Sequence, residues 1–144
     1  MNNLKVQSVP KKDYDNVTSF ALKTWTKYNE ENNYFYKEKE FRWAAYIKGK
    51  IVGYIYGNTN GGVAYLDDII VDIKFRNIGI GKILLKKFEE IAKKNHCHVC
   101  LLATTDKHAK AIAFYKRNGY VIEAKLANMY WNVNEYYMVK RLGK

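Results

Sequence analysis

The sequence predicts one α+β domain over residues 1–144, in which helices and strands follow one another in an irregular order. Two strand-like runs, residues 41–48 and 51–57, flank a Lys-Gly-Lys turn, and a third run occupies residues 63–71. A glycine-containing loop, an amphipathic helix and a buried-looking strand at residues 98–103 come next. These runs predict three antiparallel strands followed by a strand–helix–strand unit, within a chain of ordinary single-domain length.

The N-terminal segment predicts a short strand and then a helix. Leu4, Val6 and Val9 suggest the strand, which Pro10 ends. Over residues 13–28, apolar side chains recur at a spacing of three to four, as on one face of a helix. Residues 28–39 are polar and aromatic without a period, so a loop with at most one short helix is expected there.

The second half of the chain predicts two more helices and three more strands. The helix after the glycine loop reaches about residue 95 and carries an apolar stripe. The stripe consists of Ile80, Ile83, Leu84, Phe88, Ile91 and Ala92. A short helix at residues 108–117 ends at Asn118-Gly119, and strands are expected at residues 98–103, 120–125 and 134–142.

Charge and composition narrow the class of protein. The net charge is +11, of which +1 falls in residues 1–72 and +10 in residues 73–144. A basic half favours an anionic ligand, but lysine outnumbers arginine 21 to 4. Because bidentate recognition of phosphate and guanine favours arginine, nucleic acid is disfavoured as a partner. The chain has neither an apolar run long enough to cross a membrane nor an apolar leader, so a cytoplasmic protein without membrane contact is expected.

The loop Arg76-x-x-Gly79-x-Gly81 carries the clearest chemical signal. Two glycines allow a tight turn, and the unpaired N–H groups of a helix N-terminus follow at once. A pyrophosphate is the natural ligand of such a site. Two other phosphate loops do not fit, because Ile83 replaces the hydroxyl residue of a P-loop and Leu84 replaces the third glycine of a dinucleotide-binding fingerprint.

Two blocks of the sequence resemble the GNAT superfamily of N-acetyltransferases. Residues 66–85 resemble its acetyl-CoA motif, with the strand, the loop and the helix, and residues 111–120 (AIAFYKRNGY) resemble its second motif. The resemblance covers about residues 41–142 and extends to small uncharacterised bacterial acetyltransferases. It implies an α/β/α sandwich with a mixed, mostly antiparallel sheet of six or seven strands and about four helices. Two splayed parallel strands, residues 63–72 and 98–103, would form the CoA cleft.

The resemblance implies a set of residues for acetyl-CoA. Backbone groups of residues 69–71 would pair with the pantetheine arm, and the Ile69 N–H would polarise the acetyl carbonyl. Backbone N–H groups of residues 77–82 would hold the pyrophosphate. The implied cofactor-binding residues are Ile69, Ile70, Val71, Arg76, Asn77, Ile78, Gly79, Ile80, Gly81, Lys82, Thr104, Lys110 and Tyr115.

The same resemblance implies Tyr115, Asp67 and Asp68 as catalytic groups. Tyr115 matches the family tyrosine that protonates the departing thiolate, a role suited to a phenol with a reference pKa of about 10. A carboxylate would take the proton of the amine. Because successive strand side chains point to opposite faces, one aspartate is expected to face the acceptor. Asp67, which by simple alternation shares a face with Ile69 and Val71, is preferred, with Asp68 as the alternative.

The amine acceptor is expected in an aromatic-lined pocket, although packing of the same aromatic residues is the plainer alternative. The candidate residues are Trp25, Tyr28, Tyr34, Asp67 and Tyr130. The candidates for the CoA phosphates are Lys82, Lys86, Lys107, Lys110 and Lys116. The positive net charge disfavours highly cationic acceptors such as polyamines. A homodimer through the tyrosine-rich last strand is a further expectation.

A metal site is not expected. The run His-Cys-His-Val-Cys at residues 96–100 contains ligand types, but Cys97 and Cys100 are expected on opposite faces of a strand, and no second cluster completes four ligands. Two functions remain open. The first is an acetyl-CoA-dependent N-acetyltransferase that acylates a primary amine of a small molecule, peptide or protein directly, through a tetrahedral intermediate. The alternative is a CoA-binding module with little catalysis, which serves as a regulatory, partner-binding or nucleic-acid-associated domain.

Overall fold

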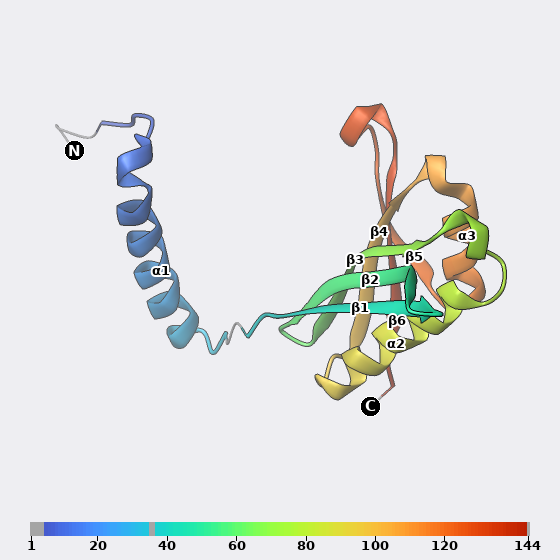
Figure 1. Ribbon diagram of the computed structural model, residues 1–144. Helices are drawn as coiled ribbons and strands as arrows, with labels where there is room; N and C mark the ends of the chain where they lie inside the picture. Colours follow the sequence, from blue (N-terminus) through green and yellow to red (C-terminus); the bar gives the residue numbers. More distant parts are fainter. Residues whose placement is uncertain (1–4, 35–36, 144) are drawn as a thin grey trace. The chain divides into compact units, whose positions relative to one another are not determined.

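The computed structural model describes residues 5–34 and 37–143. The chain divides into two compact units, residues 1–35 and residues 36–144. The first contains one α-helix, and the second contains a six-stranded sheet and two α-helices (Figure 1). The sheet matches the lower end of the expected strand number, whereas the residues that the structure describes form three α-helices where about four were expected. None of the helices in the described ranges is both long enough and apolar enough to cross a membrane.

The N-terminal unit consists mainly of α1 (Tyr14–Glu31), which confirms the helix expected at residues 13–28 and extends it by three residues. A 3-10 turn (Lys11–Asp13) follows Pro10 and leads into it. The strand expected at residues 4–9 is wrong for its described part, because residues 5–10 have no regular structure; Leu4 lies outside the described residues. An extended segment becomes a strand only where a neighbour completes its hydrogen-bond ladder, and alternating apolar residues do not supply that neighbour.

The C-terminal unit is built on a sheet with the strand order β1-β2-β3-β4-β6-β5. Its strands are β1 (Lys39–Ile47), β2 (Lys50–Asn60), β3 (Val63–Val71), β4 (Val99–Thr105), β5 (Val121–Leu126) and β6 (Glu135–Arg141). Only β3 and β4 are parallel neighbours, and the other four pairs are antiparallel. The predicted meander of three antiparallel strands and the mixed, mostly antiparallel sheet are therefore confirmed.

Helices α2 (Ile80–Lys94) and α3 (Ala109–Arg117) pack beside each other on one face of this sheet. A side-chain carbon added at Gly81 of α2 would lie 3.5 Å from the Phe114 ring of α3. The buried side of α2 consists of Ile80, Leu84, Leu85, Phe88 and Ala92. Ile83, expected in this stripe, is 66% exposed, and Leu85 lies in the core in its place. Burying one Leu or Phe side chain contributes about 1.5–3 kcal/mol, so the stripe anchors α2 and the loop before it to the sheet.

Candidate active site

The sheet opens between β3 and β4. The two strands pair from Val63–Val99 to Leu66–Leu102, and there the pairing ends. Both strands continue beyond this point, β3 to Val71 and β4 to Thr105. The second half of β3 stays paired with β2 on its other side. Its backbone groups that face β4 therefore have no β4 partner, and the splayed parallel strands expected from the sequence are confirmed.

A β-bulge marks the point where the strands part. Gly57 of β2 lies opposite Leu66, and Tyr56 lies opposite Asp68, so Asp67 is an extra residue in β3. A bulge of this kind shifts the alternation of side chains by one position. Leu66 is buried before the bulge, and Ile69 packs against the same core after it, although simple alternation would place these two on opposite faces.

The bulge places both aspartates on the face turned away from α2. Asp68 accepts a 2.6 Å hydrogen bond from the hydroxyl of Tyr54, and Asp67 accepts a 3.5 Å bond from the side-chain amide of Asn58. Tyr54 and Asn58 alternate along β2 with Ile55, whose side chain is fully buried in the core. The expectation that Asp67 shares a face with Ile69 and Val71, and that Asp68 points the other way, is therefore wrong. It assumed regular alternation, which the extra residue interrupts.

Asp67 has the electrostatics of a proton acceptor. Partial burial, followed by the negative charge of Asp68, raises the pKa of its carboxyl above the usual value, and Glu38 and Glu40 add to this effect. The hydrogen bond from Asn58 acts in the opposite direction. A raised pKa brings a carboxylate nearer to neutral pH, where a general base is most effective. Asp67 and Asp68 thus differ in environment while lying side by side in the chain.

Tyr115 is the buried tyrosine of α3. It is 7% exposed, and its ring packs against Phe114 and Tyr120, with centroids 5.4 and 5.9 Å away. Burial raises the pKa of its phenol to about 12, and the negative charge of Asp68 contributes to the same shift. Tyr115 therefore keeps its proton at neutral pH and lies within electrostatic range of β3. The charge of Asp68 thus acts on Tyr115, a residue 47 positions later in the sequence.

The glycine loop presents the N-terminus of α2 beside the opened end of β3. Arg76 donates a 2.9 Å hydrogen bond from Nε to the carbonyl of Val71, so its side chain holds the loop to the strand. Gly79 has a φ of +96°, a left-handed conformation that glycine adopts without strain. The first helical hydrogen bond runs from the Ile83 N–H to the Gly79 carbonyl. The preceding amides, those of residues 80–82, precede any intrahelical acceptor and can bind an anion.

Packing alone does not require glycine at position 81. A side-chain carbon there would meet Phe114 and Val71 at 3.5–3.8 Å, which is ordinary van der Waals contact. The missing side chain instead leaves the helix N-terminus open to a ligand that approaches the backbone closely. The loop thus suits the pyrophosphate of CoA, in agreement with the motif that suggested it.

Three of the remaining candidate residues lie in the C-terminal unit. Thr104 is buried on β4 opposite Tyr136, and Lys110 lies in the first turn of α3. Tyr130 lies in a 3-10 turn between β5 and β6. Burial raises the pKa of Tyr65 on β3, and smaller contributions come from Tyr137, Asp67, Glu135 and Tyr130 in that order. Asp67 and Tyr130 thus both contribute to the pKa of the same phenol.

The aromatic candidates Trp25, Tyr28 and Tyr34 belong to the N-terminal unit. Trp25 and Tyr28 form an edge-to-face pair on α1, with ring centroids 5.6 Å apart. Their role at the acceptor site stays a prediction. Sequence reasoning missed Tyr54 and Asn58, which hold the two aspartates. Their signal was the alternation of polar and apolar residues along residues 53–60, with Tyr54, Tyr56, Asn58 and Asn60 on one face.

The two cysteines belong to the core. Cys97 precedes β4 and Cys100 lies within it, and both thiols join the same hydrophobic cluster. The expectation that they occupy opposite faces is therefore wrong, because Cys97 is not yet in the strand. Burial raises the pKa of the Cys100 thiol to about 12. Across the ranges 5–34 and 37–143, no three His, Cys, Asp or Glu side chains are grouped as a metal ion would require.

A sheet opened at a parallel pair, beside a glycine loop and a helix N-terminus, differs from a P-loop or dinucleotide-binding fold. The model of the Acetyltransferase (GNAT) family matches residues 10–120, and the chain belongs to this family. Streptothricin acetyltransferase A of Bacillus subtilis is 32% identical over 101 residues, which cover 69% of this chain and 58% of that protein. The chain spans about half to three-fifths of the length of the first curated relatives that it matches.

Solved structures support the same fold. An acetyltransferase from Bacillus cereus superposes with a TM-score of 0.79 at 23% identity, with 99% of this chain and 100% of that chain covered. A protein provisionally named streptothricin acetyltransferase from Bacillus anthracis was crystallised with acetyl coenzyme A. It superposes with a TM-score of 0.70 at 27% identity, with 78% of this chain and 68% of that chain covered.

Proposed function

We propose that this protein is an acetyl-CoA-dependent N-acetyltransferase that acetylates a primary amine directly. The observation that carries the proposal is the opening between β3 and β4, which begins after Leu66 and Leu102. This part of the C-terminal unit contains the unpaired edge of β3, the amides of the α2 N-terminus, two aspartates and a protonated tyrosine. Membership of the GNAT family supports the same activity.

The chain would hold acetyl-CoA mainly through its backbone. The edge of residues 69–71 that faces β4 offers N–H and C=O groups to the amides of the pantetheine arm, and the amides of residues 80–82 offer donors to the pyrophosphate. When bound, acetyl-CoA supplies an acetyl thioester. The N–H of Ile69 is our candidate donor to the acetyl carbonyl, where a fixed donor stabilises negative charge as it develops.

Two carboxylates are available to take the proton of the incoming ammonium group. The raised pKa of Asp67 favours this residue as the base. Asp68 accepts a hydrogen bond from the Tyr54 hydroxyl, and its negative charge acts on Tyr115. We assign the proton transfer to this pair, with Asp67 as its base. Tyr54 is a positioning residue, because it acts on the site through Asp68.

Tyr115 provides the proton for the departing thiolate of CoA. The amine nitrogen forms a bond to the acetyl carbon, the carbon–sulfur bond breaks, and the phenol gives its proton to the sulfur. The burial that raises the pKa of Tyr115 to about 12 keeps this proton available over the whole neutral range. The acceptor is an amine of a small molecule, a peptide or a protein, and Tyr130 is its candidate contact in the C-terminal unit.

The test combines binding with turnover. Purified protein is titrated with acetyl-CoA while its thermal stability is followed, and thiol release is then measured with amino acids, polyamines, aminoglycosides and peptide N-termini. A thermal shift together with acceptor-dependent thiol release would support the enzyme and identify its acceptor class. A shift without turnover across the panel would favour the CoA-binding module. Absence of any shift would contradict the assignment of the opening to CoA.

A further inference from the structure

Four strands of the sheet contribute segments at the level of the opening, and these segments are acidic. They are residues 67–71 of β3, 103–105 of β4, 124–126 of β5 and 135–137 of β6. Their carboxylates are Asp67, Asp68 and Glu135, and their only basic residue is Lys125. The Lys125 amine lies 5.9 Å from the centroid of the Tyr136 ring, which packs against the core. Lys125 is thus directed to the helix-bearing side of the sheet.

The side chains of Glu135 and Tyr137 lie on the outer face of the sheet, the face turned away from α2. Met138, the next residue of β6, is fully buried in the core, so by alternation these two residues point to the other side. Tyr137 lies opposite Ala103 of β4 and Ala124 of β5. Because both neighbours are small, the Tyr137 ring has no large side chain beside it in its row of the sheet.

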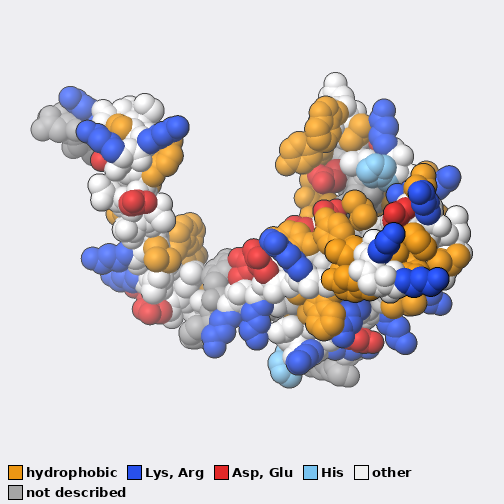
Figure 2. Space-filling model, viewed as in Figure 1, with side chains coloured by type: hydrophobic (Ala, Val, Ile, Leu, Met, Phe, Trp, Pro, Cys, Tyr) orange, Lys and Arg blue, Asp and Glu red, His pale blue; other side chains and the backbone are white. Residues whose placement is uncertain are grey.

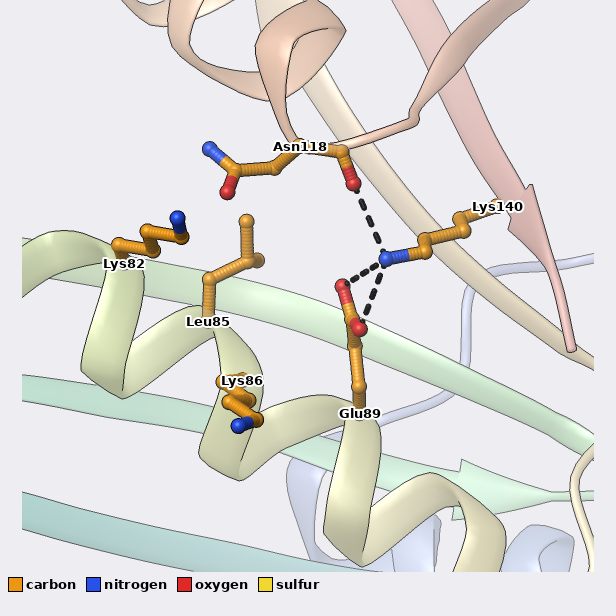
Figure 3. A pocket seen from close by; sticks show the side chains of 6 residues that line it. All are labelled: Lys82, Leu85, Lys86, Glu89, Asn118 and Lys140. Carbon is orange, nitrogen blue, oxygen red and sulfur yellow. Dashed lines mark hydrogen bonds and ion pairs between the residues drawn. The ribbon is translucent and has the colours of Figure 1, made fainter.

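The carboxylate of Glu135 differs from other carboxylates of the unit in its partners. Glu89 of α2 accepts 2.8 Å bonds at both oxygens from Lys140 (Figure 3), and Glu123 of β5 accepts a 2.8 Å bond from Arg141. Glu135 belongs to none of the ion pairs found among the described residues. Its side chain is also partly buried, so its negative charge is available to a cation.

The charge of this outer face is opposite in sign to the net charge of the chain. Lysine and arginine side chains are spread over the visible face of the C-terminal unit (Figure 2), whereas the segments around the opening direct only carboxylates outward. Burial raises the pKa of the Tyr65 phenol, and the smaller contributions to this shift include the negative charges of Asp67 and Glu135. The argument from net charge against cationic acceptors therefore does not hold at this face, which attracts them.

The spacing of Asp67 and Glu135 suits two charges of one elongated ligand. In the sheet, β6 is the second strand from β3, so their backbones lie at least about 10 Å apart across the strands. Leu66 pairs with Leu102, whereas Glu135 lies opposite Thr105. Glu135 is therefore also displaced by about two residues along the strands, or about 7 Å.

We propose that Glu135 and the Tyr137 ring bind a second positive charge of the acceptor, which is a small aliphatic diamine. This inference rests on the proposed function and specifies its acceptor class. One amine of the diamine lies at Asp67, where it loses its proton and attacks the acetyl group. The other remains an ammonium group, forms an ion pair with Glu135 and contacts the face of the Tyr137 ring. Glu135 and Tyr137 thus determine specificity and transfer no proton.

The test compares two acceptors of equal length, 1,6-diaminohexane and 6-amino-1-hexanol, of which only the first carries a second positive charge. The wild-type kcat/KM should be about tenfold or more higher for the diamine, as suits one hydrogen bond between charged groups. Glu135→Gln keeps the size of the side chain and should reduce this ratio to about one, mainly through a higher KM for the diamine. The matched control Glu90→Gln removes the same charge from an exposed position of α2 and should keep the ratio.

A second pair of variants tests the aromatic ring independently of the carboxylate. Tyr137→Leu should lower the ratio, because it removes the ring face that contacts the cation. Tyr137→Phe keeps that face and should restore the ratio. Thermal stability with and without acetyl-CoA is followed for every variant, so that a folding defect is distinguished from a change in specificity.

Three results would overturn the proposal. The first is an equal kcat/KM of the wild type for the diamine and the amino alcohol. The second is a ratio that survives in Glu135→Gln, which would place the second charge elsewhere. The third is a protein that acetyl-CoA stabilises but that acetylates neither compound: the diamine class is then wrong, and the proposed function depends on the wider panel of amines. If acetyl-CoA causes no thermal shift, the proposed function fails together with this inference.

Discussion

The first four residues of β3 and its last five have different neighbours, although they form one continuous strand. Residues 63–66 pair with β2 on one side and with β4 on the other. Residues 68–71 stay paired with β2 but have no partner on β4, and Asp67 is the extra residue of the bulge. Backbone groups that are paired on both sides stabilise the fold and leave nothing for a ligand. The opened half retains one free edge, and every candidate residue of β3 lies in it.

A single extra residue separates the two halves. Asp67 is inserted opposite the Tyr56–Gly57 step of β2, and from that point the side chains change faces. Before it, Ala64 and Leu66 fill the core; after it, Ile69 and Val71 do so. Changes in the paired half should therefore alter the free energy of unfolding, whereas changes around the opened half should alter catalysis. Three predictions test this separation, and a fourth tests the electrostatics of the bulge that divides the two halves.

The largest effect is expected for Tyr115→Phe. The ring can keep its contacts with Phe114 and Tyr120, but the proton donor is lost, so kcat should fall by about 10²–10⁴-fold. Steady-state kinetics with the identified amine measures this fall, and urea unfolding should show little change in stability. The control Tyr46→Phe removes an exposed phenol of β1 and should leave kcat unchanged. A normal kcat in Tyr115→Phe would contradict the role of this hydroxyl.

Gly57→Ala tests the paired half. A side-chain carbon at this position would collide with the carbonyl of Tyr65 and lie 2.6 Å from the Phe41 ring. Because a backbone atom cannot move aside easily, the free energy of unfolding should fall by about 2–3 kcal/mol, as measured by urea unfolding. The control Gly143→Ala meets open space and should have little effect. If Gly57→Ala keeps its stability but its folded fraction loses much of its kcat, the assignment of stability to the paired half is contradicted.

Tyr54→Phe tests whether the contact with Asp68 positions the catalytic pair. Removing the hydroxyl deletes the 2.6 Å hydrogen bond, and kcat/KM should fall by about tenfold, a typical effect for one charged hydrogen bond. Because Tyr54 acts on the reaction through Asp68, the fall should lie mainly in kcat, with the KM for acetyl-CoA nearly unchanged. The control Tyr56→Phe loses only a 3.4 Å contact with Glu40 and should keep the wild-type kcat/KM. Equal kcat/KM values in both variants would reduce Tyr54 to a packing role.

The smallest effect concerns Asp67→Asn and stability against pH. Burial and the charge of Asp68 raise the pKa of Asp67 in the folded state, so the folded state holds this proton more tightly than the unfolded chain. Stability from this source is full below the unfolded pKa, about 3.9, and is lost as pH rises through the folded pKa. Asp67→Asn should therefore be more stable than the wild type at pH 7, and the difference should shrink toward pH 3. Urea unfolding at both pH values measures it.

The control for this comparison is Asp15→Asn on α1, which removes the same charge in the N-terminal unit. It should not reproduce the pH-dependent gain. A loss of stability in Asp67→Asn at pH 7 would show that its bond with Asn58 outweighs the cost of its burial. The case for Asp67 as the base would then be weakened, because it depends on the raised pKa of this carboxyl.

Local sequence patterns predicted most of the helices and strands. The 3–4 spacing predicted α1 and α2, the Asn118-Gly119 stop predicted the end of α3, and the Lys-Gly-Lys turn predicted the β1–β2 hairpin. These features depend on residues close together in the chain, so a sequence reveals them directly. The strand at residues 4–9 failed for the opposite reason, because a strand depends on a partner elsewhere in the chain.

The sequence by itself determined the family, the glycine loop before α2 and the types of residue available for chemistry. The tertiary structure decided which of them meet. The bulge at Asp67 arises from the register between β2 and β3, and it reverses the face that alternation assigns. The opening between β3 and β4 requires two strands that are far apart in the sequence. Faces and registers depend on how the elements pair and pack. The sequence alone does not specify which distant residues become neighbours, so these features appear only in the tertiary structure.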